Sequence, residues 1–168
     1  SEYNTRRKEC ETAVDRIRND HPEVNALRDV NQDTLEQYKG ILDPVVLRRC
    51  SYVIKENERV LDACNALSNG DIVDFGKLMY ASHYGLRDEY EVSCNELDLL
   101  VSLTEGMDYV LGSRMMGGGF GGCTINILKP EFLDEFKSRV RSGYEKATAS
   151  FPAFYEVNIS NGAGLLPS

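Results

Sequence analysis

The chain carries five glycines around one phenylalanine, in the run GGGFGG at positions 117–122. Glycine loses more conformational freedom on folding than any other residue, so such a run predicts positive φ angles or a close backbone contact. Because no side chains stand in the way, the N–H groups of this loop could also face an anion such as a phosphate. We interpret loop 117–122 either as a tight hairpin pressed by another segment, or as a loop beside a phosphate or a second glycine-rich segment.

The residues around this loop exclude the familiar nucleotide-binding loops. Gly117, Gly119 and Gly122 satisfy the pattern GxGxxG, but a dinucleotide-binding loop opens a helix, whereas the strand-like run CTINIL follows here. A Walker A loop needs Gly-Lys followed by Ser or Thr, which the chain lacks. Lys129 resembles the lysine of a protein kinase, yet only 39 residues follow it, and they contain no HRD or DFG motif.

Composition and charge narrow the class of protein. A chain of 168 residues with 42% hydrophobic and 27% charged residues fits one globular domain with a sizeable core. The net charge of -8 and the pI near 4.8 argue against a nucleic-acid or anionic-membrane partner. No run of 18 apolar residues predicts a transmembrane helix.

The start of the chain and its cysteines favour a cytoplasmic protein. The first residues, SEYNTRRKEC, are unlike a signal peptide, and because they lack a Met we expect the sequence to begin inside a longer protein. The cysteines are odd in number and contain no CxxC pair, which favours reduced, buried thiols. They are Cys10, Cys50, Cys64, Cys94 and Cys123.

The periodicity of apolar residues predicts helices over the first two thirds of the chain. In the stretch 5–19 apolar residues recur at i, i+3, i+4 and i+7, as on a helix with one buried face. Asp33 and Glu36 have the spacing of a capping box for a short helix that ends near Gly40.

A long helix is predicted to begin at Pro44, because Asp43 is a favourable N-cap and proline suits the first helical position. It ends at 69–70, where Asn-Gly follows, and a further helix starts after Asp71. The segment 93–97, SCNEL, has the form of a capping box before another helix. The long helix carries one apolar stripe: Leu47, Cys50, Ile54, Leu61, Cys64 and Leu67.

The last third of the chain changes to the pattern of strands. The runs at 108–116 and 123–128 flank the glycine loop, and a helix opens at 129–130. The segment 154–160, FYEVNIS, alternates apolar and polar residues and predicts a last strand, with Tyr155, Val157 and Ile159 on one face. Helices with a few successive short strands indicate an α+β domain.

Four stretches, in this order, resemble the sugar kinases of the GHMP superfamily, in particular the galactokinase family. They are SEYNTRRKECE (1–11), RRCSYVIKENERV (48–60), SHYGLRDEYEVSCNELDLL (82–100) and GSRMMGGGFGGCT (112–124). The resemblance extends over essentially the whole chain. It departs from the family pattern at Gly85, where Ser is frequent, and at Asn95, where Pro is frequent.

The resemblance implies a sugar kinase that uses ATP to phosphorylate galactose at the anomeric hydroxyl, in a cleft between two domains. The motifs of the family's N-terminal half, which supplies the phosphate-binding loop, the magnesium-coordinating acid and the catalytic Asp and Arg, do not occur here. Residues 1–168 thus resemble the single C-terminal domain, with a small antiparallel, ferredoxin-like sheet packed against a layer of helices. We expect no catalytic residue and no metal site in this chain, and no activity of the chain alone.

By the same resemblance, galactose, ATP and Mg²⁺ are bound together with the N-terminal half of a full-length, monomeric enzyme, and none of them is expected on the isolated chain. An exposed interface toward that half would allow the isolated chain to dimerise. Two other functions remain open: a non-catalytic, sugar-sensing or regulatory module related to galactokinase, and a GHMP kinase that acts on N-acetylgalactosamine.

The resemblance assigns roles to one tyrosine and to the glycine loop. Tyr3 matches a tyrosine that helps to bind galactose, for which its hydroxyl and flat apolar face are suited. The residues of the loop match a segment that braces the phosphate-binding loop of the N-terminal half, with Phe120 as a packing residue. They are Gly117, Gly118, Gly119, Phe120, Gly121 and Gly122.

His83 lies near several acidic residues, and such a cluster could bind a metal or transfer protons. The resemblance instead places this segment in the packing of helices. We expect Arg87, Asp88 and Arg114 to form an ion-pair network near the glycine loop.

Overall fold

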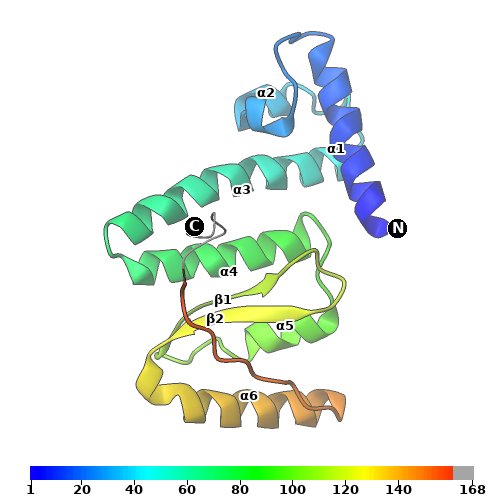
Figure 1. Ribbon diagram of the computed structural model, residues 1–168. Coiled ribbons are helices and arrows are strands. Elements are labelled where there is room, and N and C mark those ends of the chain that lie inside the picture. The colour runs from blue at the N-terminus through cyan, green and yellow to red at the C-terminus, as the bar shows by residue number, and fades with distance from the viewer. Residues whose placement is uncertain (161–168) are drawn as a thin grey trace, which may run out of the picture.

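The structure is a computed structural model and describes residues 1–160. Within this range, helices and two strands follow one another as Figure 1 shows. The elements are α1 (Glu2–Arg18), a 3-10 helix (Leu27–Asp29), α2 (Gln32–Glu36), α3 (Pro44–Ser68), α4 (Ile72–Asp88), α5 (Asn95–Ser102), β1 (Val110–Met116), β2 (Cys123–Leu128), a second 3-10 helix (Pro130–Phe132) and α6 (Leu133–Thr148).

The sheet lies between helices. β1 and β2 pair antiparallel, with Met116 opposite Cys123 at the end that leads into loop 117–122. α4 packs on β1, while α5 and α6 lie on the other side of the sheet, and α1, α2 and α3 form a layer beyond α4 (Figure 1). The α+β class with an antiparallel sheet packed on helices is confirmed.

Separate hydrophobic clusters hold these layers. Ile17 of α1 and Leu35 of α2 are buried with the first half of α3. Phe136 and Val140 attach α6 to the sheet, and Met115 of β1, fully buried, packs with α5 and the segment before it. Loop 117–122 therefore emerges from a strand whose last buried residue is fixed by the core.

Two predicted helix starts are confirmed by their caps. The carboxylate of Asp43 accepts hydrogen bonds from two N–H groups in the first turn of α3, at 2.8 and 3.4 Å. Asp71 caps α4 in the same way, at 2.9 Å. Such bonds satisfy N–H groups that have no partner inside the helix.

Two other predicted caps are wrong. Asn31, not Asp33, caps α2, because its side-chain oxygen accepts the N–H of Thr34 at 2.8 Å. Ser93 does not cap α5, because its hydroxyl donates to the carboxylate of Asp98 instead. At α2 a neighbouring residue takes the capping bond, whereas α5 follows its N-cap residue Cys94 without a side-chain cap.

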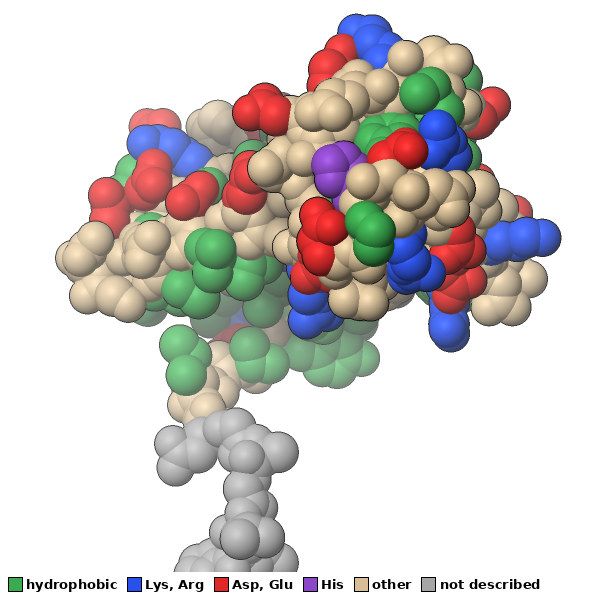
Figure 2. All heavy atoms as spheres, turned by 90° about the horizontal axis from the view of Figure 1, so that it is seen from above, with side chains coloured by type: hydrophobic (Ala, Val, Ile, Leu, Met, Phe, Trp, Pro, Cys, Tyr) green, Lys and Arg blue, Asp and Glu red, His purple; other side chains and the backbone are tan. Residues whose placement is uncertain are grey.

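The apolar stripe of the long helix is buried only in its first half. Cys50 and Ile54 are buried, whereas Leu61 and Leu67 are 66% and 48% exposed. α3 extends beyond the cluster that α1 and α2 form with it, so these two helices do not cover its second half, which lies along α4. The exposed apolar residues there, which we call the α3–α4 surface, are Val60, Leu61, Leu67 and Val73. Figure 2 also shows hydrophobic side chains gathered on the part of the molecule that α3 and α4 form.

The predicted last strand is wrong for the residues described. Residues 151–160 form no strand, although Phe154 packs against Phe136 with ring centroids 6.3 Å apart. The side chains of Tyr155, Val157 and Ile159 are exposed. Alternation predicts an extended chain, but a strand also needs the edge of a neighbour, and none pairs with this segment.

All five cysteines are free, as expected of reduced thiols. Cys50 is buried, but Cys64 and Cys123 are exposed, so the expectation of burial is wrong for these two.

Candidate functional site

Loop 117–122 joins β1 to β2 with a left-handed backbone, as the glycine run predicts. The φ angles of Gly117 and Gly119 are +83° and +86°, and those of Gly121 and Gly122 are +133° and +107°. Phe120 also has a positive φ, +59°, which is uncommon for a residue with a side chain. A non-glycine residue in this conformation must be held by its surroundings.

The close backbone contact predicted for this loop comes from within the chain. The N–H of Phe120 donates to the carbonyl of Val92, in the segment between α4 and α5, at 2.7 Å. A Cβ atom on Gly119 would collide with that same carbonyl oxygen. Glycine at 119 is therefore required twice, by its φ angle and by the approach of Val92.

Tyr3 lies on the other side of the loop. Its hydroxyl donates to the carbonyl of Gly119 at 3.2 Å, and its ring meets that of Phe120 edge to face, with centroids 5.5 Å apart. A Cβ on Gly118 would press into the tyrosine ring. The structure thus brings together the tyrosine and the glycine loop, 116 residues apart in sequence.

The rest of the loop faces open space. Among the atoms of residues 1–160, a Cβ added at Gly117 or Gly121 would meet none within 4 Å, and one added at Gly122 would meet a single atom, at the 4.0 Å limit. Within residues 1–160, Phe120 is the one loop residue whose N–H donates to a backbone carbonyl. The rings of Tyr3 and Phe120 are also partly exposed, at 53% and 40%. This side of the loop can therefore receive another chain segment or a ligand.

Arg6, which sequence reasoning missed, completes the site. Its guanidinium donates to the carbonyls of Tyr90 and Glu91 at 2.8 and 2.7 Å, and lies over the Phe120 ring, 5.9 Å from its centroid. One signal was available: Arg6 falls on the apolar stripe of α1, four residues before Cys10. A charged residue on such a stripe is buried only when its donors find partners.

His83 belongs to the packing of α4 rather than to a reactive cluster. The side chain is fully buried, and its Nδ1 accepts the N–H of Met115 at 3.3 Å. Its Nε2 lies 3.3 Å from a carboxylate oxygen of Asp98. Within residues 1–160, no three His, Cys, Asp or Glu side chains lie together in a way that could hold a metal ion. His83 instead ties α4 to the strand that leads into the glycine loop.

Burial lowers the pKa of His83 below its ordinary value, despite the opposing effect of Asp98. The unfolded chain therefore takes up this proton first as the pH falls. We expect the contribution of His83 to the free energy of unfolding to be fully present above about pH 6.5. As the pH falls below that value, the free energy of unfolding should decrease by at most about 1.4 kcal/mol per pH unit for one proton. Urea unfolding between pH 5 and 8 measures this slope.

The substitution His83→Gln should flatten that slope, because the amide of glutamine does not titrate. His21→Gln is the matched control, since the His21 side chain is partly exposed. Equal slopes in the unmodified chain and in His83→Gln would show that His83 does not govern the pH dependence.

The predicted ion-pair network is wrong in one part. Arg87 and Asp88 pair with each other, at 2.7 and 2.8 Å. Arg114 is not with them, because its guanidinium lies 3.7 Å from the carboxylate of Glu56 on α3. Glu56 also pairs with Arg59. Arg114 thus links β1 to α3 across α4, in a separate network.

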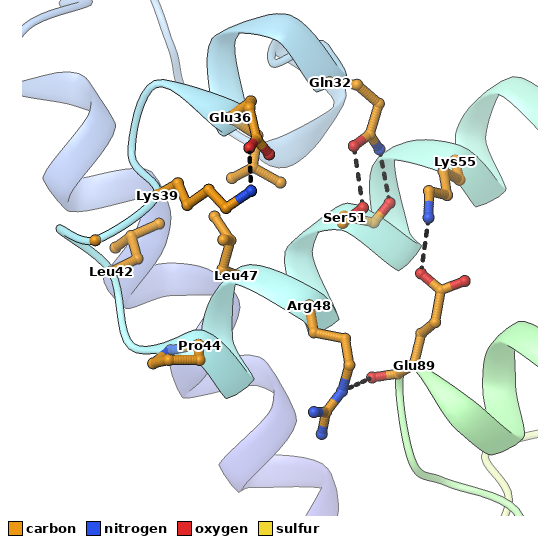
Figure 3. A pocket seen from close by; sticks show the side chains of 12 residues that line it. Gln32, Glu36, Lys39, Leu42, Pro44, Leu47, Arg48, Ser51, Lys55 and Glu89 are labelled. Atoms are coloured by element: carbon orange, nitrogen blue, oxygen red, sulfur yellow. Dashed lines mark hydrogen bonds and ion pairs between the residues drawn. The ribbon is translucent and has the colours of Figure 1, made fainter.

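A separate concavity of about 420 Å³ lies between α2 and the start of α3 (Figure 3). Its polar side chains are paired with one another, as the dashed lines of Figure 3 show, and Leu42, Pro44 and Leu47 contribute apolar lining. The paired groups are Gln32 with Ser51, Glu36 with Lys39 and Lys55 with Glu89. With these groups satisfied, we place the candidate site at loop 117–122.

Among the described residues, no helix has both the length and the apolar character needed to cross a bilayer.

Comparison with known proteins gives consistent matches. Residues 60–146 match the model of the family described as GHMP kinases C terminal. A galactokinase of Clostridium acetobutylicum is 45% identical over 164 residues, covering 97% of this chain and 42% of that protein. A galactokinase of Roseiflexus is 38% identical, with 98% and 42% covered.

Comparison with solved structures also gives a match to a galactokinase. The structure of Lactococcus lactis galactokinase complexed with galactose matches with a TM-score of 0.86 and 31% identity, covering 92% of this chain and 40% of that one. The chain therefore spans about two fifths of the length of the relatives that it matches.

Proposed function

The chain belongs to the GHMP kinase family, and on that premise we propose that residues 1–168 are the C-terminal domain of a galactokinase, a cytoplasmic enzyme that phosphorylates galactose at its anomeric hydroxyl with ATP. The observation that carries the proposal is the contact of Tyr3 with loop 117–122. This contact places a side chain that can bind a sugar next to a loop that can pack against a phosphate-binding loop, at one exposed site.

In this proposal Tyr3 contributes to the sugar pocket. Its hydroxyl donates its proton to the carbonyl of Gly119, so its oxygen lone pairs remain to accept a hydrogen bond from a sugar hydroxyl. Its exposed ring offers a flat apolar face to the sugar ring. Fixed on the first turn of α1 by Phe120, the side chain is ordered before the sugar binds, which lowers the entropy lost on binding.

Loop 117–122 braces the phosphate-binding loop of the N-terminal half. Gly117, Gly121 and Gly122 leave open backbone where another glycine-rich loop can approach. Phosphoryl transfer depends mainly on positioning and on neutralising charge, so a supporting loop affects the rate without touching the reacting atoms.

ATP supplies the transferred phosphoryl group when bound, and Mg²⁺ neutralises the charge of its phosphates. The described residues of this chain do not fit the ion, because no suitable cluster of ligands is present among residues 1–160. We therefore assign the ligands of Mg²⁺ and the catalytic groups to the N-terminal half, and expect the isolated chain to be inactive.

The α3–α4 surface supports docking to another body. Val60, Leu61, Leu67 and Val73 are each about half exposed or more, and gathered apolar side chains of this kind mark contact surfaces. In the full-length monomer we expect the N-terminal half to cover apolar surface of this domain. The isolated chain is then expected to dimerise, which sedimentation at several concentrations would detect.

A fusion tests the proposal. Joining this chain to the N-terminal half of the Clostridium acetobutylicum galactokinase should give ATP-dependent phosphorylation of galactose, while neither half alone turns over. A second variant tests the role of Tyr3: in the same fusion, Tyr3→Ala should raise the KM for galactose more than the KM for ATP.

A folded fusion that phosphorylates N-acetylgalactosamine but not galactose would contradict the proposed acceptor. A folded fusion that binds galactose without turnover would contradict the catalytic role and favour a regulatory module.

A further inference from the structure

The first turns of α1 carry an unusual buried charge. The whole residue Arg6 is 7% exposed, whereas the side chain of its neighbour Arg7 is 79% exposed. Burying a guanidinium is unfavourable unless its donors are satisfied. The partners of Arg6 therefore show what its position requires.

All of those partners except Glu2 lie on segments other than α1. Nε and Nη2 donate to the carbonyls of Tyr90 and Glu91, and Nη1 lies 3.3 Å from the carboxylate of Glu2. The planar group also lies over the ring of Phe120, 5.9 Å from the centroid. One side chain thus connects α1, the segment between α4 and α5, and loop 117–122.

The two carbonyls that accept hydrogen bonds from Arg6 directly precede the carbonyl that accepts a hydrogen bond from the loop. Tyr90 and Glu91 directly precede Val92, whose carbonyl accepts the Phe120 N–H at 2.7 Å. Glu91 has a positive φ of +59°, as does Phe120. Backbone in this region persists only where its surroundings fix it, and Arg6 contacts both residues.

We propose that Arg6 is a positioning residue that sets the shape of loop 117–122 by fixing the carbonyls of Tyr90 and Glu91, which precede Val92, on one side and the Phe120 ring on the other. It acts through these groups and touches no reacting atom. Its effect on the loop follows from the contacts of this chain alone. Its effect on ATP rests on the proposed function, in which this loop braces the phosphate-binding loop.

The role requires arginine rather than a positive charge in general. The planar fork of the guanidinium donates in two fixed directions and stacks on an aromatic ring, whereas a lysine ammonium is a compact point charge on a flexible stem. Lysine at position 6 would keep the charge beside Glu2 but lose the paired donation to two successive carbonyls.

The test compares Arg6→Lys with Arg7→Lys in the full-length fusion, because Arg7 lies on the same helix turn and, among residues 1–160, pairs only with exposed Glu11. Hydrogen exchange measures protection of the Phe120 amide, and steady-state kinetics measure the KM for each substrate. In Arg6→Lys we expect exchange at Phe120 to be about tenfold faster and the KM for ATP about tenfold higher, in a fusion that folds but melts at a lower temperature because two carbonyls lose their donors. The KM for galactose should change less than that for ATP, and Arg7→Lys should match the unmodified protein.

Two results separate this inference from the proposed function. Unchanged protection of Phe120 in folded Arg6→Lys would overturn the positioning role. Faster exchange at Phe120 with an unchanged KM for ATP would support the positioning role and contradict the bracing of the phosphate loop.

A measurement on the unmodified protein covers the case in which Arg6→Lys does not fold. The Nε–H of Arg6 should be protected from exchange and should show an NMR contact to the Phe120 ring. Rapid exchange of that proton, with no such contact, would overturn the inference.

Discussion

Replacing Gly119 with alanine is expected to lower kcat/KM of the full-length fusion about a hundredfold, since displacement of a positioning element by about 1 Å has effects of that size. The φ angle of Gly119 is +86°, and an added Cβ would meet the carbonyl oxygen of Val92. The loop must move away from Val92 to admit the methyl group, which breaks the hydrogen bond from Phe120. Steady-state kinetics of the fusion measure the loss.

Gly40→Ala is the matched control. Gly40 has nearly the same φ angle, +82°, but no atom of the described residues lies within 4 Å of the new Cβ, and it lies beside α2, away from the site. It should lower the free energy of unfolding by about 1–2 kcal/mol through the left-handed backbone alone and leave kcat/KM unchanged. Equal activity of the two variants would show that the contact with Val92 is not needed.

Replacing Gly76 with alanine is expected to lower the free energy of unfolding by about 2 kcal/mol, although alanine is the better helix former. A Cβ on Gly76 of α4 would collide with the carbonyl of Leu111 on β1, so helix and strand must separate. Overpacking of this kind costs about 1–3 kcal/mol or more, while the gain in helix propensity is only about 1 kcal/mol. Urea unfolding measures the difference.

Ala81→Gly is the control on the same helix. Ala81 is exposed, so this change should cost only the helix propensity, about 1 kcal/mol. If Gly76→Ala stabilised the chain by a similar amount, the close approach of α4 to β1 would be contradicted.

The local signals in the sequence predict much of this fold because they depend on neighbours along the chain. Asp43 before Pro44 predicts the start of α3 correctly, since a cap and the first turn it satisfies are adjacent. The run GGGFGG likewise predicts the left-handed backbone of loop 117–122, since only glycine adopts it readily.

Other features depend on tertiary partners that local patterns do not contain. The segment 154–160 has the alternation of a strand, but no strand among residues 1–160 pairs with it. Leu61 continues the stripe of α3 but lies beyond the helices that would cover it.

The candidate site also has features that the sequence predicts and features that depend on tertiary contacts. The resemblance to a kinase family predicts Tyr3 and the glycine loop as separate elements, and their contact appears only in the fold. Arg6 lies in the family-like stretch 1–11, but its role could not be inferred from that stretch, because its partners are main-chain carbonyls, which any residue at 90 and 91 would supply. Its position on an apolar helix face was the one local indication of its role.

Hydrogen exchange in loop 117–122, compared between the isolated chain and the fusion with an N-terminal galactokinase half, tests the docking of this loop most directly. The amide of Phe120, bonded to Val92 within the chain, should be protected in both and serves as the internal reference. The amides of Gly117, Gly121 and Gly122 should exchange rapidly in the isolated chain and at least about tenfold more slowly in the fusion. Equal rates for these glycines in the two proteins, in a fusion that is folded, would contradict the role of the loop as a brace.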